Sequence, residues 1–363
     1  HVVENGKVTR RCCFAFRTVT KELVTPELLN KMFERDFSEI IEDKPFSYED
    51  RKFVDIVSKG IHRRPDNHFE IPLPLKDPNF KLPNNRDQAL NRLYRLKRKM
   101  TSNPQYKRDY TAFMEEIIAS GYAEKIIQVD SEVSSNHDAQ IWYLPHHGIY
   151  HPKKPGKIRV VFDCSAEYKG KSLNQHLLSG PDLTNNLLGV LCRFRQEPVA
   201  VTCDIEKMFY QVYVNEEHRN LLRFLWWENS DLKGEPTEYR MTVHLFGATS
   251  SPGCANMALK ASADDGELKC GLRAADFVRR NFYVDDGLKS VLTAGEAVNF
   301  VANTQALCKR GGFHLHKFMS NNKEVLRSID SRDLATGIQE LDLTYDSLPI
   351  ERTRGVQWCV SSD

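Results

Sequence analysis

The chain has 363 residues, of which 40% are hydrophobic and 28% are charged, which is enough for one large core or about two domains. Its mean hydropathy is -0.51 and it has no run of roughly 18 uncharged apolar residues, so we expect no membrane span. It begins at His1 without an apolar signal segment, and we expect it to be an excerpt of a longer polypeptide.

The first part of the chain, residues 1–84, has weak periodicity and many prolines. We expect helices at Pro26–Phe37 and Glu49–Lys59 and an extended segment at Ile71–Leu75. These features predict a leader or linker region with little chemistry of its own.

Two amphipathic helices are predicted next, at Asn85–Met100 and Pro104–Ser120, because apolar residues recur there at helical spacing. Strands at Ile141–Pro145 and Ile158–Phe162 flank a turn rich in proline and glycine, which predicts a hairpin. From residue 183 onward, strands and helices alternate without an internal repeat, as in an α+β fold. The strands expected there are Val199–Ile205, Arg223–Trp227, Thr237–Val243, Asn281–Val284, Gly287–Val291 and Gly355–Val360, and the helices are Leu183–Arg195, Pro252 to about Asp264, and Ala294–Arg310.

Nine cysteines are spread along the chain, with no Cys-x-x-Cys pair and no histidine cluster at zinc-ligand spacing. We therefore expect no structural zinc site. The odd number and wide spacing of the cysteines are typical of reduced thiols, and predict a cytoplasmic or nuclear protein.

Two clusters of basic residues contrast with the formal net charge of +2. Between Arg92 and Arg108 there are seven basic residues and no acidic one, which is typical either of a solvated helix face or of a surface that contacts phosphates. The second cluster surrounds a turn, and its members are His151, Lys153, Lys154, Lys157 and Arg159.

Adjacent carboxylates in the segment Tyr283–Asp286 indicate metal chemistry. Because Asp285 and Asp286 repel each other, bringing them together in a turn is costly unless a cation neutralises them. The segment alone is also typical of a solvent-exposed Asp-Gly hairpin turn, and this alternative stays open. Asp204 lies at the end of a second apolar strand, and two Mg²⁺ ions need carboxylates from separate strands. We therefore predict that Asp204 and Asp285 bridge two ions, with Asp286 as an auxiliary ligand.

Three motifs occur in the order found in reverse transcriptases. They are Cys203–Tyr210 with the sequence CDIEKMFY, His244–Pro252 with HLFGATSSP, and Tyr283–Asp286 with YVDD. Two further stretches, Tyr143–Gly148 (YLPHHG) and Arg159–Ala166 (RVVFDCSA), are most similar to the polymerase of BEL/Pao-type LTR retrotransposons. The resemblance covers about residues 85–363.

The resemblance implies an RNA-directed DNA polymerase, a nucleotidyltransferase that makes DNA from dNTPs on an RNA or DNA template by two-metal phosphoryl transfer. It implies that Asp204, Asp285 and Asp286 bind two Mg²⁺ ions, for which Mn²⁺ is the alternative, and that the ring of Phe209 excludes a 2′-hydroxyl. Nucleotide binding is expected at Lys157, Arg159, Lys207, Met208, Phe209, Phe246, Gly247 and Tyr283. The candidate general acid is Lys317, the expected primer grip is Gly355, Val356, Gln357 and Trp358, and the expected template phosphate contacts are Arg92, Arg95, Arg98 and Lys99.

The resemblance also implies a right-hand polymerase fold, an α+β architecture with an antiparallel palm sheet packed on helices. Fingers are expected at 85–172 and 213–251, and the palm at 173–212 and 252–363, ending at the primer-grip strand, with the thumb outside these residues. The expected partners are a primed RNA or DNA template, dNTPs, and the protease, RNase H and integrase domains of a Pol polyprotein. The expected location is the cytoplasm, within virus-like particles, with the nucleus as the alternative, and no membrane partner is expected.

Two other functions stay open on the sequence alone. A host-recruited or fragmentary nucleic-acid-binding module without polymerase activity would fit a chain that lacks a thumb, but the intact acids Asp204, Asp285 and Asp286 favour a polymerase. A polymerase that makes RNA is disfavoured by Phe209, because such an enzyme has to admit the 2′-hydroxyl.

Overall fold

The computed structural model divides the chain into two compact units, His1–Glu42 and Asp43–Asp363. The residues that the structure describes are 2–4, 7–9, 46–127, 140–151, 154–339, 341, 350–353 and 356–359. In the first unit they form a hairpin of β1 (Val2–Glu4) and β2 (Lys7–Thr9). The helix expected at Pro26–Phe37 lies outside the described residues.

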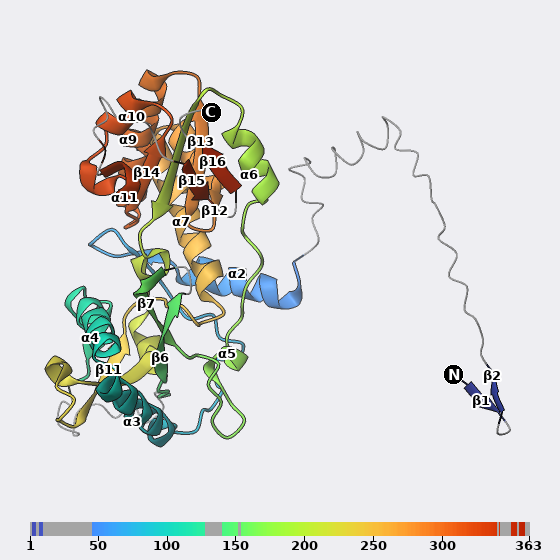
Figure 1. Cartoon of the computed structure of the whole chain (residues 1–363), viewed down its shortest axis with the longest axis vertical. Helices are drawn as coiled ribbons and strands as arrows, with labels where there is room; N and C mark the ends of the chain where they lie inside the picture. Colours follow the sequence, from blue (N-terminus) through green and yellow to red (C-terminus); the bar gives the residue numbers. More distant parts are fainter. Residues whose placement is uncertain are drawn as a thin grey trace. The chain divides into compact units, whose positions relative to one another are not determined.

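The second unit contains a four-stranded antiparallel sheet (Figure 1). Its strands, in spatial order, are β12 (Phe282–Tyr283), β13 (Asp286–Val291), β8 (Val199–Ile205) and β14 (Leu315–Ser320). In β8 every residue except Asp204 is buried, as expected for an apolar run at the centre of a core.

Three helices accompany this sheet: α7 (Ser251–Cys270), α8 (Leu272–Arg280) and α9 (Ala294–Arg310). They pack on one another, and α9 also contacts β8 and β13. Between the sheet and the helices lies a first hydrophobic core, whose members include Val201, Cys203, Leu259, Phe277 and Phe300.

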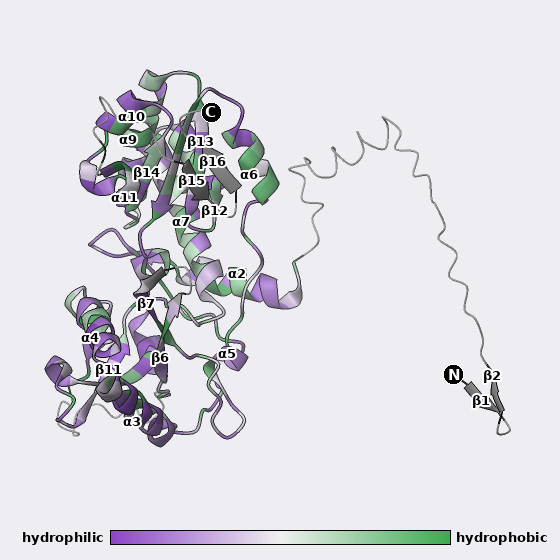
Figure 2. Ribbon diagram, in the orientation of Figure 1, coloured by the Kyte–Doolittle hydropathy of each residue, from purple (hydrophilic) through white to green (hydrophobic). Residues whose placement is uncertain are grey.

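A second hydrophobic core is formed by other helices and strands. They are α3 (Arg86–Ser102), α4 (Pro104–Ala119), the hairpin of β6 (His146–His151) and β7 (Lys154–Phe162), and the sheet of β10 (Arg223–Trp227), β11 (Pro236–Met241) and β5 (Ala123–Lys125). The side chains that α3 buries are Ala89, Leu93, Leu96 and Met100, at helical spacing. Figure 2 shows α3 as mostly hydrophilic. The α+β prediction is confirmed.

The prediction of a strand at Ile141–Pro145 is wrong. This segment is largely buried, but Tyr143 forms only an isolated bridge with Arg223. Its backbone groups are satisfied by the side chain of Asn85, which forms two hydrogen bonds of 2.7 and 2.8 Å with Tyr143, and by backbone bonds to Asn220 and Arg223. The strand that pairs with β7 is β6, which begins at His146.

Among the elements of the second half that were not predicted are α8 and β14, and one helix is longer than expected. The helix expected to end near Asp264 continues to Cys270 and is followed by α8. β14 was missed because His316 and Lys317 interrupt the alternation of apolar and polar residues.

Residues 46–84, which we predicted as part of a leader or linker, belong to the second compact unit. In α2 (Tyr48–Gly60), Phe53 and Val57 are fully buried in the first core. The strands β3 (His62–Arg63) and β4 (Phe69–Ile71) form a three-stranded sheet with β9 (Val212–Val214), which pairs in parallel with β4.

The two cores draw on alternating segments of the chain. Leu177 belongs to the second core and Leu178 to the first, and the next changes fall between residues 209 and 214 and between Ala248 and Cys254. These changes lie close to the predicted limits at 172, 213 and 251, although the division into fingers and palm remains a prediction.

The remaining elements are short. They are α5 (Leu173–His176), α6 (Leu187–Phe194), α10 (Lys323–Arg327), α11 (Thr336–Gln339), the hairpin of β15 (Ile350–Thr353) and β16 (Val356–Cys359), and the 3₁₀ helices η1 (Met208–Gln211), η2 (Glu216–Leu222), η3 (Glu228–Ser230) and η4 (Ser331–Asp333). Within the described residues, no helix combines the length and apolar character that a membrane crossing requires.

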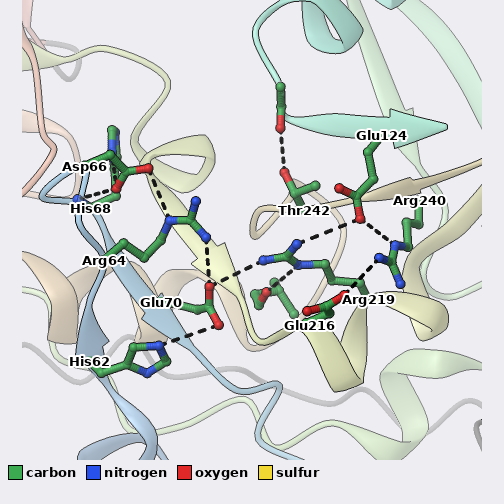
Figure 3. Close-up of polar contacts among 12 residues, drawn as sticks. His62, Arg64, Asp66, His68, Glu70, Glu124, Glu216, Arg219, Arg240 and Thr242 are labelled. Carbon is green, nitrogen blue, oxygen red and sulfur yellow. Dashed lines mark hydrogen bonds and ion pairs between the residues drawn. The ribbon is translucent and has the colours of Figure 1, made fainter. Parts of the chain in front are cut away.

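A network of charged side chains links the segment around β4 to β9, η2 and β11 (Figure 3). At its centre Arg219 donates to the carbonyl of Val214 at 2.8 Å and to the carboxylate of Glu70 at 3.3 Å. The side chains of Arg219 and Glu70 are only 11% and 13% exposed, so this ion pair is largely removed from water. Arg240 donates at 2.6 Å to Glu124, which also lies 3.8 Å from Arg219.

A neighbouring chain of hydrogen bonds reaches the end of β8. The ring of His68 contacts Gln211 at 3.4 Å, and Gln211 donates to the carbonyl of Glu206 at 2.9 Å. The charged segment around β4 therefore also supports the strand that carries Asp204.

Candidate active site

The strand register brings the predicted acids together. On β8, Asp204 lies directly opposite Asp286 of β13 on one side and His316 of β14 on the other. Directly opposite residues of an antiparallel pair have Cβ atoms about 5 Å apart and project from the same face of the sheet. Asp285 lies in the turn before β13, and its carbonyl accepts a hydrogen bond of 2.9 Å from the backbone of Ile205.

A cleft of about 250 Å³ opens at this end of the sheet. Its lining residues are Lys157, Asp204, Ile205, Glu206, Lys207, Met208, Phe209, Phe246, Val284, Asp285, His316 and Lys317, and we call it the Asp204 cleft. Besides Asp204, seven of these residues were predicted from the sequence to bind a metal ion or the nucleotide or to act as a general acid. They are Asp285, Lys157, Lys207, Met208, Phe209, Phe246 and Lys317.

Strained backbone is concentrated around the Asp204 cleft. Lys207, Val284 and Lys317 line it, and all three have positive φ angles, of 48°, 61° and 51°. Left-handed backbone is costly for residues other than glycine, most of all for a β-branched residue such as Val284. Such strain is concentrated at functional sites, where the surrounding structure holds it in place.

Both carboxylate oxygens of Asp204 have partners on β14. His316 Nε2 lies 2.9 Å from Oδ1, and Lys317 Nζ donates to Oδ2 at 2.9 Å. Burial by itself would raise the pKa of Asp204, but the hydrogen bonds from His316 and Lys317 and the charge of Lys317 outweigh it. The pKa of Asp204 therefore lies below its ordinary value, and the group is ionised at neutral pH.

Two aromatic rings form one wall of the cleft. Phe209 is 8% exposed and belongs to the first core, and its ring centroid lies 4.5 Å from that of Phe246. Phe246 is 46% exposed, and the guanidinium of Arg159 lies 6.0 Å from its ring centroid. Phe209 therefore both packs in the core and lines the cleft, and Arg159 is held near the same wall.

Gly247 has no room for a side chain. Its φ angle is +110°, and a Cβ atom would lie 2.3 Å from the carbonyl oxygen of Phe162. Asn174 donates to the carbonyl of Gly247 at 2.8 Å and accepts from the backbone of Thr249 at 3.0 Å. The loop after Phe246 is therefore bound to α5 through Asn174 and passes close to the backbone of β7 at Phe162, where only glycine fits.

The donor atoms at the cleft are of the type that Mg²⁺ prefers, since carboxylate oxygens are hard ligands. Asp204 comes from β8, Asp286 from β13, and Asp285 from the turn that joins β12 to β13. However, within the described residues no group of three or more His, Cys, Asp or Glu side chains is already arranged as a metal centre. The residues fit a metal site in their chemistry, and the strand register places all three at one end of the sheet.

Several predicted site residues lie elsewhere or are already engaged. Tyr283, Arg159, Gly247 and Asp286 are not among the residues that line the cleft. The predicted primer-grip residue Gly355 lies outside the described residues, and of Val356, Gln357 and Trp358 only the backbone, in β16, is described.

The predicted template contacts on α3 differ in availability. Arg92 donates at 2.8 Å to Asp163, and Lys99 lies 4.1 Å from the ring centroid of Tyr106. Arg95 and Arg98 line a shallow groove on the outer face of α3 together with Tyr94, which is 37% exposed.

Two histidines at the site were not found from the sequence. His316 contacts Asp204, while His314 bridges Glu206 at 2.8 Å and Asp333 at 2.9 Å. The contact with Glu206 raises the pKa of His314, although burial opposes it. The alternation of histidines at 314 and 316 was the available signal, because residues two apart share one face of a strand.

No family model and no curated protein matches this chain. Among solved structures it is similar to foamy virus protease-reverse transcriptase in complex with double-stranded DNA, with a TM-score of 0.43 and 16% identity over 79% of this chain and 42% of that one. It is also similar to a prototype foamy virus protease-reverse transcriptase mutant, with a TM-score of 0.44 and 15% identity over 80% of this chain and 30% of that one. The chain thus spans less than half the length of these two proteins, and the site is defined by its own geometry.

Proposed function

We propose that this chain is the polymerase region of a retroelement reverse transcriptase of the BEL/Pao type, which makes DNA on an RNA or DNA template. The observation that carries the proposal is the register of β8 and β13, in which Asp204 lies opposite Asp286 beside the Asp285 turn. The sequence motifs around these acids support the same class.

In this proposal Asp204, Asp285 and Asp286 hold two Mg²⁺ ions, which supply activation of the primer 3′-hydroxyl and neutralisation of the triphosphate. Lys157 and Arg159 bind the triphosphate, and the guanidinium of Arg159 is suited to two parallel hydrogen bonds. Both side chains are exposed on β7, and Lys157 lines the Asp204 cleft.

The aromatic wall of the cleft would select the sugar. Phe209 is fixed by the core beneath it and by Phe246 beside it, so its ring cannot easily move aside for a 2′-hydroxyl. A rigid ring at this position favours dNTPs over ribonucleotides. Lys317 is retained as the candidate general acid for the leaving pyrophosphate, because its ammonium reaches the same carboxylate as the metal ions.

A nucleic-acid-binding module without polymerase activity is the second candidate. It is favoured by one observation, that His316 and Lys317 already occupy both oxygens of Asp204. In that case Asp204 would serve only to hold β14 against β8.

Template-directed extension separates the two functions. The chain is given a primed RNA template or a primed DNA template, with Mg²⁺ and single dNTPs, and templated addition on both supports the polymerase. Retained binding of the primed template, without addition in either Mg²⁺ or Mn²⁺, would support the binding module instead.

A further inference from the structure

We propose that His316 is a positioning residue that fixes the orientation of the Asp204 carboxylate, so that one oxygen stays bound to β14 and the other is presented to a divalent ion. The proposal rests on the proposed function and extends it to a residue outside the three acids. Its basis is the 2.9 Å contact between His316 Nε2 and Asp204 Oδ1.

The direction of this hydrogen bond is set by its partner. An ionised carboxylate can only accept, so Nε2 of His316 has to carry the proton that is shared with Oδ1. His316 and Asp204 are also directly opposite each other in the register of β14 and β8, so the backbone ladder holds the two side chains at this separation. The side chains of both residues are 21% exposed.

A bulge in β14 allows two successive residues to reach one carboxylate. Neighbouring residues of a regular strand point to opposite faces, so His316 and Lys317 would normally diverge. The register of β14 shifts between His316 and Met319, and Lys317 has a φ angle of 51°. A bulge of this kind turns a side chain toward a site, and here it brings Lys317 Nζ to within 2.9 Å of Oδ2.

The two contacts differ in how easily they can be given up. Lys317 is 54% exposed and has a flexible side chain, so its ammonium can move away from Oδ2. His316 is less exposed and shorter. We therefore infer that His316 stays bound to Oδ1, whereas Lys317 binds Oδ2 only until a cation takes the place of its ammonium group. The two residues should affect ion binding in opposite directions.

The positioning role of His316 can be tested without catalysis by measuring how Mn²⁺ binds to the 363-residue chain. Binding is measured as the loss of the electron paramagnetic resonance signal of free Mn²⁺. The variants are His316→Gln, which keeps a donor at the position of Nε2, and His316→Met, which keeps the length but has no donor. Lys317→Met removes the competing ammonium, and Asp204→Asn removes the ligand. An exposed histidine outside the cleft, changed as His147→Gln, is the control.

We expect His316→Met to raise the half-saturating Mn²⁺ concentration about 10-fold and His316→Gln to stay within about 3-fold of the unmodified chain, since partners of metal ligands contribute on this scale. Lys317→Met should lower it. Equal weakening by His316→Gln and His316→Met, or no effect of His316→Met while Asp204→Asn loses binding, would overturn the positioning role and leave the proposed function standing. Unchanged binding in Asp204→Asn would instead remove the metal site itself.

Discussion

Asp204 and Asp286 lie directly opposite each other on neighbouring antiparallel strands, although 81 residues of sequence lie between them. Like charges at directly opposite positions destabilise a sheet, and Asp285 adds a third carboxylate next to them. At Asp204 this charge is partly offset by His316 and Lys317. A divalent cation bound by all three acids would neutralise the carboxylates together, which is the physical basis of the proposed function.

Replacing Phe209 should relax the selection of the sugar. Phe209→Ala removes one of the two rings that form the wall of the Asp204 cleft. We expect the ratio of dNTP to rNTP incorporation to fall by at least about 10-fold, because an apolar wall rejects an added hydroxyl by up to roughly 100-fold. The measurement is single-nucleotide extension with each substrate. Because Phe209 is a core residue, the variant will also be less stable, but instability lowers both rates equally. An unchanged ratio would mean that Phe209 only packs in the core.

The basic face of α3 should bind nucleic acid mainly through Arg95 and Arg98, which line its outer groove. Changing both to Gln should weaken binding of a primed template about 10-fold at low salt and reduce the slope of log affinity against log salt by about 2. The matched control is Arg92→Gln, since Arg92 is bound to Asp163, and it should affect binding less. An equal loss in both variants would contradict this division of roles.

The ion pair of Arg219 and Glu70 should contribute strongly to stability, because both side chains are largely buried. Arg219→Met removes one partner, and we expect the free energy of unfolding to fall by about 3 kcal/mol. Arg273→Met is the control: Arg273 is 80% exposed in its pair with Glu296 and should cost less than about 1 kcal/mol. Urea unfolding measures both changes, and similar small losses would show that the network is not a structural link.

Much of the fold could be predicted from local patterns. The strand Val199–Ile205 and the helix Ala294–Arg310 have the predicted bounds, because a dense apolar run and a capped amphipathic segment are strong local signals. The convergence of Asp204 with Asp285 and Asp286 was predicted as a condition for a site, and the register of β8 and β13 meets it.

The features that were missed depend on tertiary contacts. α2 was assigned to a leader because nothing in its local sequence shows that Phe53 and Val57 enter a core formed by residues much later in the chain. β14 has polar residues at 316 and 317 that are explained only by the presence of Asp204 opposite them. The spacing of His314 and His316 marks both residues in the sequence, but only the structure shows that His316 contacts Asp204.

The most direct test of the account is primer extension in Mg²⁺ by the unmodified chain and by Asp285→Asn, with binding of the primed template measured in parallel. Asparagine keeps the size of the side chain but removes the charge that an ion requires. We expect extension to fall by at least about 100-fold, because even the partners of metal ligands are worth 10- to 100-fold, while template binding changes little. Extension by Asp285→Asn at a rate close to that of the unmodified chain would contradict the metal-dependent polymerase site.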